Sequence, residues 1–162
     1  MTRVSYEFMK QDMTHWIALG FGTGLSPWAP GTVGSLLGIP LFFLLRPLPF
    51  ALQWGLLLAL FLLGIWVCGA TAEALGDQDP SAVVWDEVVS CAAVLAVAPP
   101  TWAGWALGFG LFRLLDIWKP IPIRWVDERV KGGWGIMLDD GLAAVIASWI
   151  LWHVRGVWNG TF

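Results

Sequence analysis

The acidic residues in the second half of the chain occur in small groups inside or beside apolar stretches. The candidates for chemistry among them are Asp86, Glu87, Asp116, Asp139 and Asp140, with Asp127 as a further candidate. Carboxylates gathered in one place repel one another unless a cation neutralises them. Because this set offers only oxygen atoms, with no cysteine or histidine, it favours Mg²⁺ or a similar hard cation over zinc. The pattern therefore predicts a divalent metal site.

Basic residues lie close in the sequence to these carboxylates. Arg113, Lys119 and Arg124 would suit an anionic ligand, and arginine can hold phosphate oxygens through two parallel hydrogen bonds. A metal site next to basic side chains, in a chain with long apolar stretches, indicates a phosphorylated lipid as the ligand.

A stretch rich in glycine and proline, from Gly20 to Ser35, could contribute to the same site. Its composition interrupts regular helix, and irregular backbone at membrane depth has to line a cavity or be buried in protein. The stretch could present backbone N–H groups to phosphate just before a helix that starts at Val33. It could equally be a re-entrant or linking segment without chemistry.

The composition limits the class of protein that positions these residues. Of the 162 residues, 57% are hydrophobic, only 13% are charged, and 13 are tryptophan. This excludes a disordered chain and exceeds what an ordinary soluble domain of this size can bury. The net charge of −3 and the lack of a lysine or arginine run argue against a nucleic-acid partner. Cys68 and Cys91 lie in apolar stretches, so no disulfide framework is indicated.

Apolar segments separated by prolines and charges predict about five hydrophobic helices. They are Val33–Leu45, Phe50–Gly69, Ser81–Ala98, Thr101–Trp118 and Gly141–Val157. The second is long enough to cross a bilayer, whereas the first reaches only about 20 Å and could lie partly in the interface. We expect an all-α fold, a compact multi-helix bundle embedded in a membrane. It would comprise a polar segment over residues 1–15, a single helical domain over 16–157 and a tail over 158–162.

The positive residues predict how this bundle is oriented. The block from Arg113 to Lys131 holds five basic residues, which places it on the cytoplasmic side. Asp86 and Arg113 lie at matching distances of about 18 Å on either side of the turn at Pro99-Pro100, so they should reach the same level. We expect Asp139 and Asp140 to begin the last helix from that side. The candidate site therefore faces the cytoplasm.

Simpler interpretations of the same residues exist. The pair Asp86-Glu87 could mark a solvated helix end, and Arg113 with Asp116 could be an ordinary surface ion pair. The whole chain could be a small membrane protein without enzymatic activity, such as a transport subunit or a scaffold, because intramembrane carboxylates also mark ion pathways. It could also be a soluble helical phosphatase that acts on another phosphate compound.

Several segments resemble one known family, and together they run through most of the chain. They are Gly20–Pro40 (GFGTGLSPWAPGTVGSLLGIP), Val84–Glu87 (VWDE), Phe112–Asp127 (FRLLDIWKPIPIRWVD) and Gly132–Asp140 (GGWGIMLDD). Their order and spacing resemble phosphatidylglycerophosphatase A, a bacterial membrane enzyme of phospholipid synthesis. The chain departs from the pattern at Ser90 and Ala144, where the family has glycine.

The resemblance implies Mg²⁺-dependent hydrolysis of phosphatidylglycerophosphate to phosphatidylglycerol and phosphate, by a multi-pass protein of the bacterial inner membrane. It implies that Asp86, Glu87, Asp116, Asp139 and Asp140 hold one or two Mg²⁺ ions and act in catalysis. Arg113, Lys119 and Arg124, with Ser26 and Thr32, would bind the substrate phosphate. Either a water molecule or one of the carboxylates would attack phosphorus.

Overall fold

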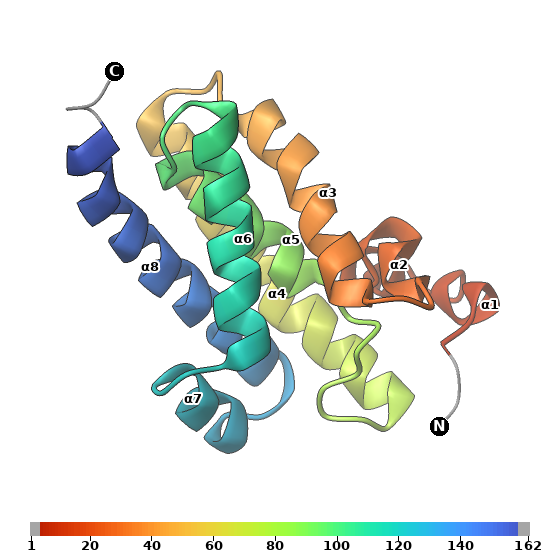
Figure 1. The fold of residues 1–162 in the computed structure, drawn as a ribbon. Coiled ribbons are helices and arrows are strands. Elements are labelled where there is room, and N and C mark those ends of the chain that lie inside the picture. The colour runs from red at the N-terminus through yellow and green to blue at the C-terminus, as the bar shows by residue number, and fades with distance from the viewer. Residues whose placement is uncertain (1–3, 159–162) are drawn as a thin grey trace.

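The computed structural model describes residues 4–158, and each regular element in this range is a helix (Figure 1). The helices are α1 (Tyr6–Met9), α2 (Met13–Ala18), the 3-10 helix η1 (Gly20–Leu25), α3 (Pro30–Leu45), α4 (Phe50–Leu75), α5 (Trp85–Val97), α6 (Trp102–Trp118), α7 (Ile123–Arg129) and α8 (Gly132–Trp158). The all-α prediction is confirmed. Residues 1–3 of the expected polar segment and 159–162 of the expected tail lie outside the described residues.

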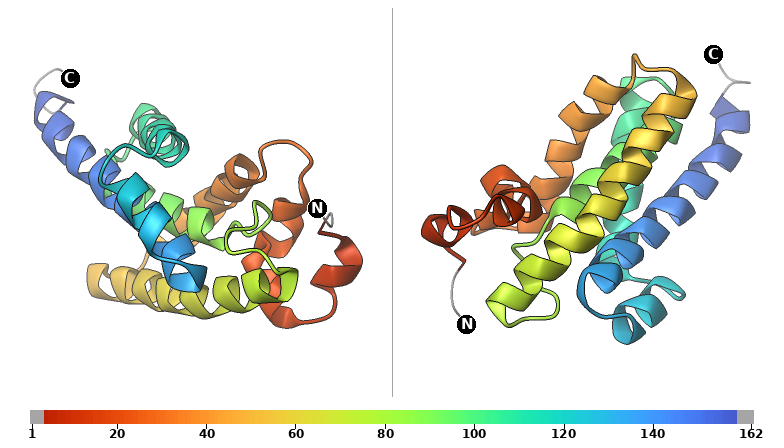
Figure 2. Two further views of the ribbon diagram at one scale, coloured as in Figure 1. Left: turned by 90° about the horizontal axis from the view of Figure 1, so that it is seen from below. Right: turned by 180° about the vertical axis from the view of Figure 1, so that it is seen from behind.

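Helix α5 is the centre of the bundle. It packs against α3, α4, α6 and α8, which surround it (Figures 1 and 2). The surrounding helices explain why α5 is apolar on all sides and why Val88, Ala92 and Leu95 are each at most 2% exposed. A helix that is hydrophobic all round is stable only when it is enclosed in this way.

The outer faces of the long helices are apolar as well. Leu58, Leu62 and Trp66 on α4, and Val145 and Trp149 on α8, are all more than half exposed. In the part of the chain that the structure describes, α4 and α8 are the two helices long and apolar enough to cross a membrane. These exposed apolar faces fit a lipid environment better than water. The other predicted helices form, but they are shorter than a full bilayer span.

Prolines and local caps end the helices where the sequence indicates. The segment Pro47–Pro49 separates α3 from α4, and Pro99-Pro100 separates α5 from α6. The Thr101 hydroxyl accepts a hydrogen bond from the Gly104 N–H at 3.0 Å and so caps α6. Lys119 adopts a left-handed conformation directly after α6, and Pro120 follows it. The hairpin of α5 and α6 therefore forms as the sequence predicts.

The predicted start of the last helix is wrong. Helix α8 begins at Gly132 rather than Gly141, so Asp139 and Asp140 lie about two turns inside it. A side chain at Gly133 would collide with the backbone carbonyl of Ile65. The absence of a side chain at Gly133 therefore lets the first turn of α8 pack closely against α4.

Two smaller expectations also need correction. Residues 81–84 precede α5 as a turn and irregular backbone, because the helix starts only at Trp85. The first 15 residues are not simply an exposed polar segment. His15 is buried on α2, with its Nδ1 atom 2.9 Å from the Thr71 hydroxyl of α4.

Candidate active site

Three carboxylates from two helices meet at the end of the bundle where α5 and α8 begin. Asp86 and Glu87 lie in the first turn of α5, and Asp140 comes from α8. One oxygen atom from each can be chosen so that all three lie within 4.8 Å of one another. The amino terminus of α5 is a favourable place for two acidic residues because of the helix dipole.

These carboxylates are buried and incompletely bonded. Asp86 is 8% exposed and Asp140 is 2% exposed. Within residues 4–158, Oδ1 of Asp86, Oε2 of Glu87 and Oδ2 of Asp140 accept no hydrogen bond. A buried polar atom without a partner costs about 1–3 kcal/mol, and more when it is charged. Three carboxylates that lie this close and each keep an unpartnered oxygen fit a hard divalent cation.

Arg113, on α6, also lies beside these carboxylates. Its Nη1 atom lies 3.9 Å from Oε1 of Glu87 and forms an ion pair with Asp116 on the same helix. This contact confirms that Glu87 and Arg113 lie at the same level of the hairpin, as the sequence predicts. The Arg113 side chain is only 13% exposed, so it is not an ordinary surface residue.

Helix α3 closes the cluster and contributes a residue that the sequence analysis did not select. Nη1 of Arg113 donates to the Ser35 hydroxyl at 3.3 Å, and that hydroxyl donates to the Gly31 carbonyl at 2.8 Å. A side chain at Gly31 would collide with Oε1 of Glu87. The backbone of the first turn of α3 thus lies directly against the carboxylates. The sequence gives one indication of this role: Ser35 follows Gly31 by four residues, so the two lie on the same side of a helix.

Asp116 and Asp139 accept hydrogen bonds from basic side chains. Asp116, paired with Arg113, also lies close enough to Asp140 for the two charges to interact. Asp139 turns away from its neighbour Asp140, because consecutive side chains on a helix point about 100° apart. Its Oδ2 atom accepts a hydrogen bond from Nζ of Lys119 at 2.6 Å. The structure therefore brings Asp139 to Lys119 rather than to the three-carboxylate cluster.

Lys119 connects three helices. Besides Asp139 of α8, its Nζ atom donates to Oδ1 of Asp127 on α7 at 2.8 Å. Burial lowers the pKa of Lys119, but the hydrogen bonds to Asp127 and Asp139 outweigh this and hold its pKa above the ordinary value. The amine is therefore charged at neutral pH and holds α7 against α8.

The remaining predicted phosphate ligands lie at the edge of the site or beyond it. The Ser26 hydroxyl donates to the Trp28 carbonyl at 2.9 Å, which shapes the loop before α3. Thr32 is half-buried in the first turn of α3, next to Gly31. Arg124 is exposed and pairs with Glu128 one turn along α7, at 3.6 Å. A phosphate-binding role for these three residues stays a prediction.

We expect Lys119→Met to lower the stability of the protein by about 1–3 kcal/mol, because Asp139 would be left buried without its partner. The double variant Lys119→Met, Asp139→Asn should recover part of this loss, since it removes the unpaired charge. Thermal unfolding in detergent, followed by tryptophan fluorescence, measures both. A single variant as stable as the wild type would contradict the structural role of Lys119.

Comparison with known proteins places this arrangement in a family. The family model for Phosphatidylglycerophosphatase A matches residues 16–155. The chain belongs to the phosphatidylglycerophosphatase A family. The match contains all three helices that carry the carboxylates and Arg113. No solved structure matches the chain.

Individual relatives agree with this assignment. Phosphatidylglycerophosphatase A of Escherichia coli is 43% identical over 145 residues, which cover 89% of this chain and 84% of the relative. The protein of the same name from Haemophilus influenzae is 43% identical over 143 residues, covering 87% and 88%. A relative from Bacteroides thetaiotaomicron, 42% identical over 153 residues and covering 83% and 93%, carries a provisional phosphatidylinositol-3-phosphatase name. All three names describe phosphatases that act on phosphorylated phospholipids.

Proposed function

We propose that this protein hydrolyses phosphatidylglycerophosphate to phosphatidylglycerol and inorganic phosphate in phospholipid synthesis. Membership of the phosphatidylglycerophosphatase A family supports the reaction and the substrate. The observation that carries the proposal is the group of three carboxylates with buried, unpartnered oxygens beside Arg113, whose side chain is largely shielded from solvent. Such a group can bind a phosphate monoester through a cation on one side and a guanidinium on the other.

The cation that fits the donor set is Mg²⁺, held by Asp86, Glu87 and Asp140. When bound, it would neutralise phosphate charge and lower the pKa of a water molecule. Asp116 lies beside Asp140 and could add a further ligand, whereas Asp139 would act through its contact with Lys119. The oxygen-only donor set supports Mg²⁺ over zinc, since no histidine or cysteine joins the cluster among the described residues.

Arg113 would orient the phosphate and stabilise the charge that develops on it. Its Nη1 atom is committed to Ser35 and Asp116, but its Nε atom is buried and has no hydrogen-bond partner between residues 4 and 158. This leaves a donor for a phosphate oxygen. The neighbouring Ser35 hydroxyl and Asp116 carboxylate fix the plane of the guanidinium, so the donor is positioned before the substrate arrives.

The protein would lie in the bacterial inner membrane with the site at the cytoplasmic face. Helices α4 and α8 support a membrane location. The basic residues near the site, from Arg113 to Lys131, cluster at one end of the bundle, and the positive-inside rule assigns this end to the cytoplasm. Arg46, stacked on Trp105 at 5.0 Å, marks the opposite end.

A phosphate-release assay with the purified protein tests the function and the metal together. The substrates are phosphatidylglycerophosphate and phosphatidylinositol 3-phosphate in mixed micelles, each with Mg²⁺, with EDTA, and with EDTA followed by excess Mg²⁺. We expect release from phosphatidylglycerophosphate that is abolished by EDTA and restored by Mg²⁺. Release that EDTA does not affect would contradict the metal site. Release from neither lipid would favour a membrane protein without this activity.

A further inference from the structure

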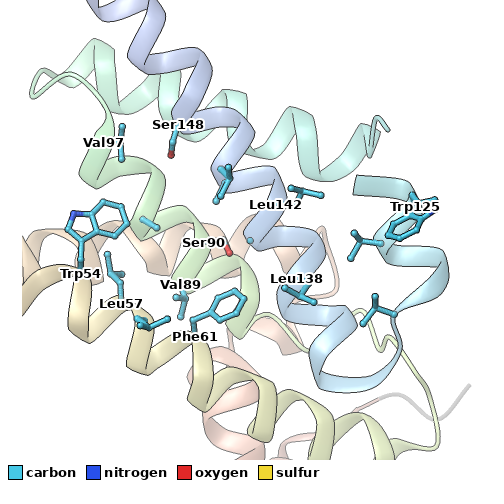
Figure 3. Close-up of a pocket in the computed structure, with 17 residues that line it drawn as sticks. Trp54, Leu57, Phe61, Val89, Ser90, Val97, Trp125, Leu138, Leu142 and Ser148 are labelled. Atoms are coloured by element: carbon cyan, nitrogen blue, oxygen red, sulfur yellow. The ribbon is translucent and has the colours of Figure 1, made fainter. Parts of the chain in front are cut away.

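An apolar groove runs along α5 between α4 and α8, and α7 borders one end (Figure 3). Its volume is about 790 Å³. Trp54, Leu57 and Phe61 of α4 form one wall, and Leu138 and Leu142 of α8 form the other (Figure 3). The groove opens on the apolar outer surface of the bundle. A ligand in it would therefore be apolar and would enter sideways from the lipid.

The groove lies one helical turn from the candidate active site. On α5 the lining residues Val89 and Ser90 lie three and four positions after Asp86, on the same side of the helix. On α8 the lining residue Ala144 lies four positions after Asp140, again on the same side. A molecule that fills the groove and extends past this end would reach the carboxylates. The same helices thus present a polar site and an apolar channel to one ligand.

The largely apolar lining and the length of the groove suit an acyl chain, and its two hydroxyl side chains are Ser90 and Ser148. At the end near the carboxylates, the Ser90 hydroxyl is buried and unpartnered in the described structure (Figure 3). From Leu138 to Ser148, α8 runs along the groove for about 15 Å. This is about half of the roughly 30 Å hydrocarbon core of a bilayer, which is the depth that one acyl chain occupies.

We propose that the groove binds one acyl chain of the lipid whose phosphate occupies the carboxylate cluster. This inference rests on the proposed phosphatase function and adds that the enzyme holds its substrate by the chain as well as the headgroup. An acyl chain bound in the groove would hold the phosphate of the same lipid close to the carboxylates. The enzyme should therefore prefer long-chain substrates even when all substrates are fully dispersed in detergent.

The first test measures binding without activity. Phosphatidylglycerophosphate with a diazirine in the middle of one chain is photolysed with the wild-type protein in EDTA, and the labelled peptides are mapped. We expect labelling concentrated on the groove faces of α4 and α8, and loss of that labelling when unlabelled long-chain lipid competes. Labelling spread over the exposed apolar surface without competition would overturn the groove, even if the phosphatase assay succeeds.

The second test blocks the groove. Ala93 is a half-buried groove residue on α5, and Ala59 is an exposed residue on α4 that does not line the groove. Relative to wild type, Ala93→Phe should reduce the ratio of kcat/KM for dioleoyl over dihexanoyl substrate at least tenfold, whereas Ala59→Phe should leave it unchanged. An unchanged ratio in Ala93→Phe would overturn the inference. If the wild-type protein released phosphate from neither substrate, the proposed phosphatase function itself would be contradicted.

A second copy of the chain is the other possible occupant of this face. Val145 lines the groove and is 63% exposed, and the native Cys68 and Cys91 are buried. A Val145→Cys variant should stay monomeric under oxidation in micelles if a lipid chain fills the groove. Efficient intermolecular disulfide formation would show that the face is a dimer interface and would overturn the lipid assignment.

Discussion

Replacing Asp140 by asparagine is expected to reduce phosphate release from phosphatidylglycerophosphate about a thousandfold and to raise the melting temperature. The loss of activity comes from the loss of a metal ligand, and the gain in stability comes from the relief of charge repulsion. Asp140 is 2% exposed and stands among Asp86, Glu87 and Asp116, so its charge is repelled when no cation is bound. Asparagine keeps the shape of the side chain and removes that repulsion. It also removes a carboxylate that a divalent cation would need.

The rate estimate follows from the effect of losing one electrostatic contact in a buried catalytic site, which is about 10²–10³ in kcat. Glu128→Gln is the matched control, since Glu128 is exposed on α7 and carries the same charge change. Its activity should stay within twofold of the wild type. Activity and thermal unfolding are measured in the same detergent with and without Mg²⁺. An Asp140→Asn enzyme with near-wild-type activity would mean that the site is misplaced.

The comparison of the two variants also separates catalytic from structural roles. Replacing a residue that stabilises the fold makes the protein less stable. Replacing a functional residue that is repelled by its neighbours makes the protein more stable. The wild-type protein should be stabilised by Mg²⁺ through mass action, and Asp140→Asn should lose most of that stabilisation. A melting temperature that rises with Mg²⁺ equally in both proteins would contradict metal binding at Asp140.

The parts of the site that the sequence predicted are those fixed by local geometry. The rise of a helix and the turn at Pro99-Pro100 are enough to place Asp86, Glu87 and Arg113 at one level, because both helices of the hairpin start or end at recognisable signals. The 3.9 Å distance between Glu87 Oε1 and Arg113 Nη1 confirms this calculation for that pair. The contact could be predicted because α5 and α6 follow each other in the sequence and are joined by a short turn.

The parts that the sequence did not predict depend on contacts between distant segments. The glycines around Gly133 indicate a turn locally, but α4 and α8 use them to approach each other. Placing the helix start at Gly141 then hid the fact that Asp139 and Asp140 point in different directions. Ser35 was overlooked for a similar reason, because its hydroxyl becomes significant only when Arg113 of α6 reaches α3.

Replacing Arg113 by lysine is expected to reduce kcat/KM about a hundredfold, although the charge is retained. The arginine meets Ser35, Glu87 and Asp116 at once and leaves its Nε free. Lysine is a single point of charge on a flexible chain and cannot reproduce this planar set of contacts. Because it still neutralises the neighbouring carboxylates, the variant should fold, which a neutral replacement would not ensure.

Two further variants decide whether geometry or charge is responsible. Ser35→Ala removes one contact to Arg113 and keeps the charge, so it should reduce kcat/KM by about tenfold, in line with one lost hydrogen bond. Lys131→Gln removes an exposed positive charge near the same end of the bundle and should have no more than a twofold effect. If Arg113→Lys retained wild-type kcat/KM, the local positive charge alone would account for phosphate binding. If Lys131→Gln were as damaging as Arg113→Lys, the effect would come from long-range attraction of the anionic lipid rather than from an oriented guanidinium.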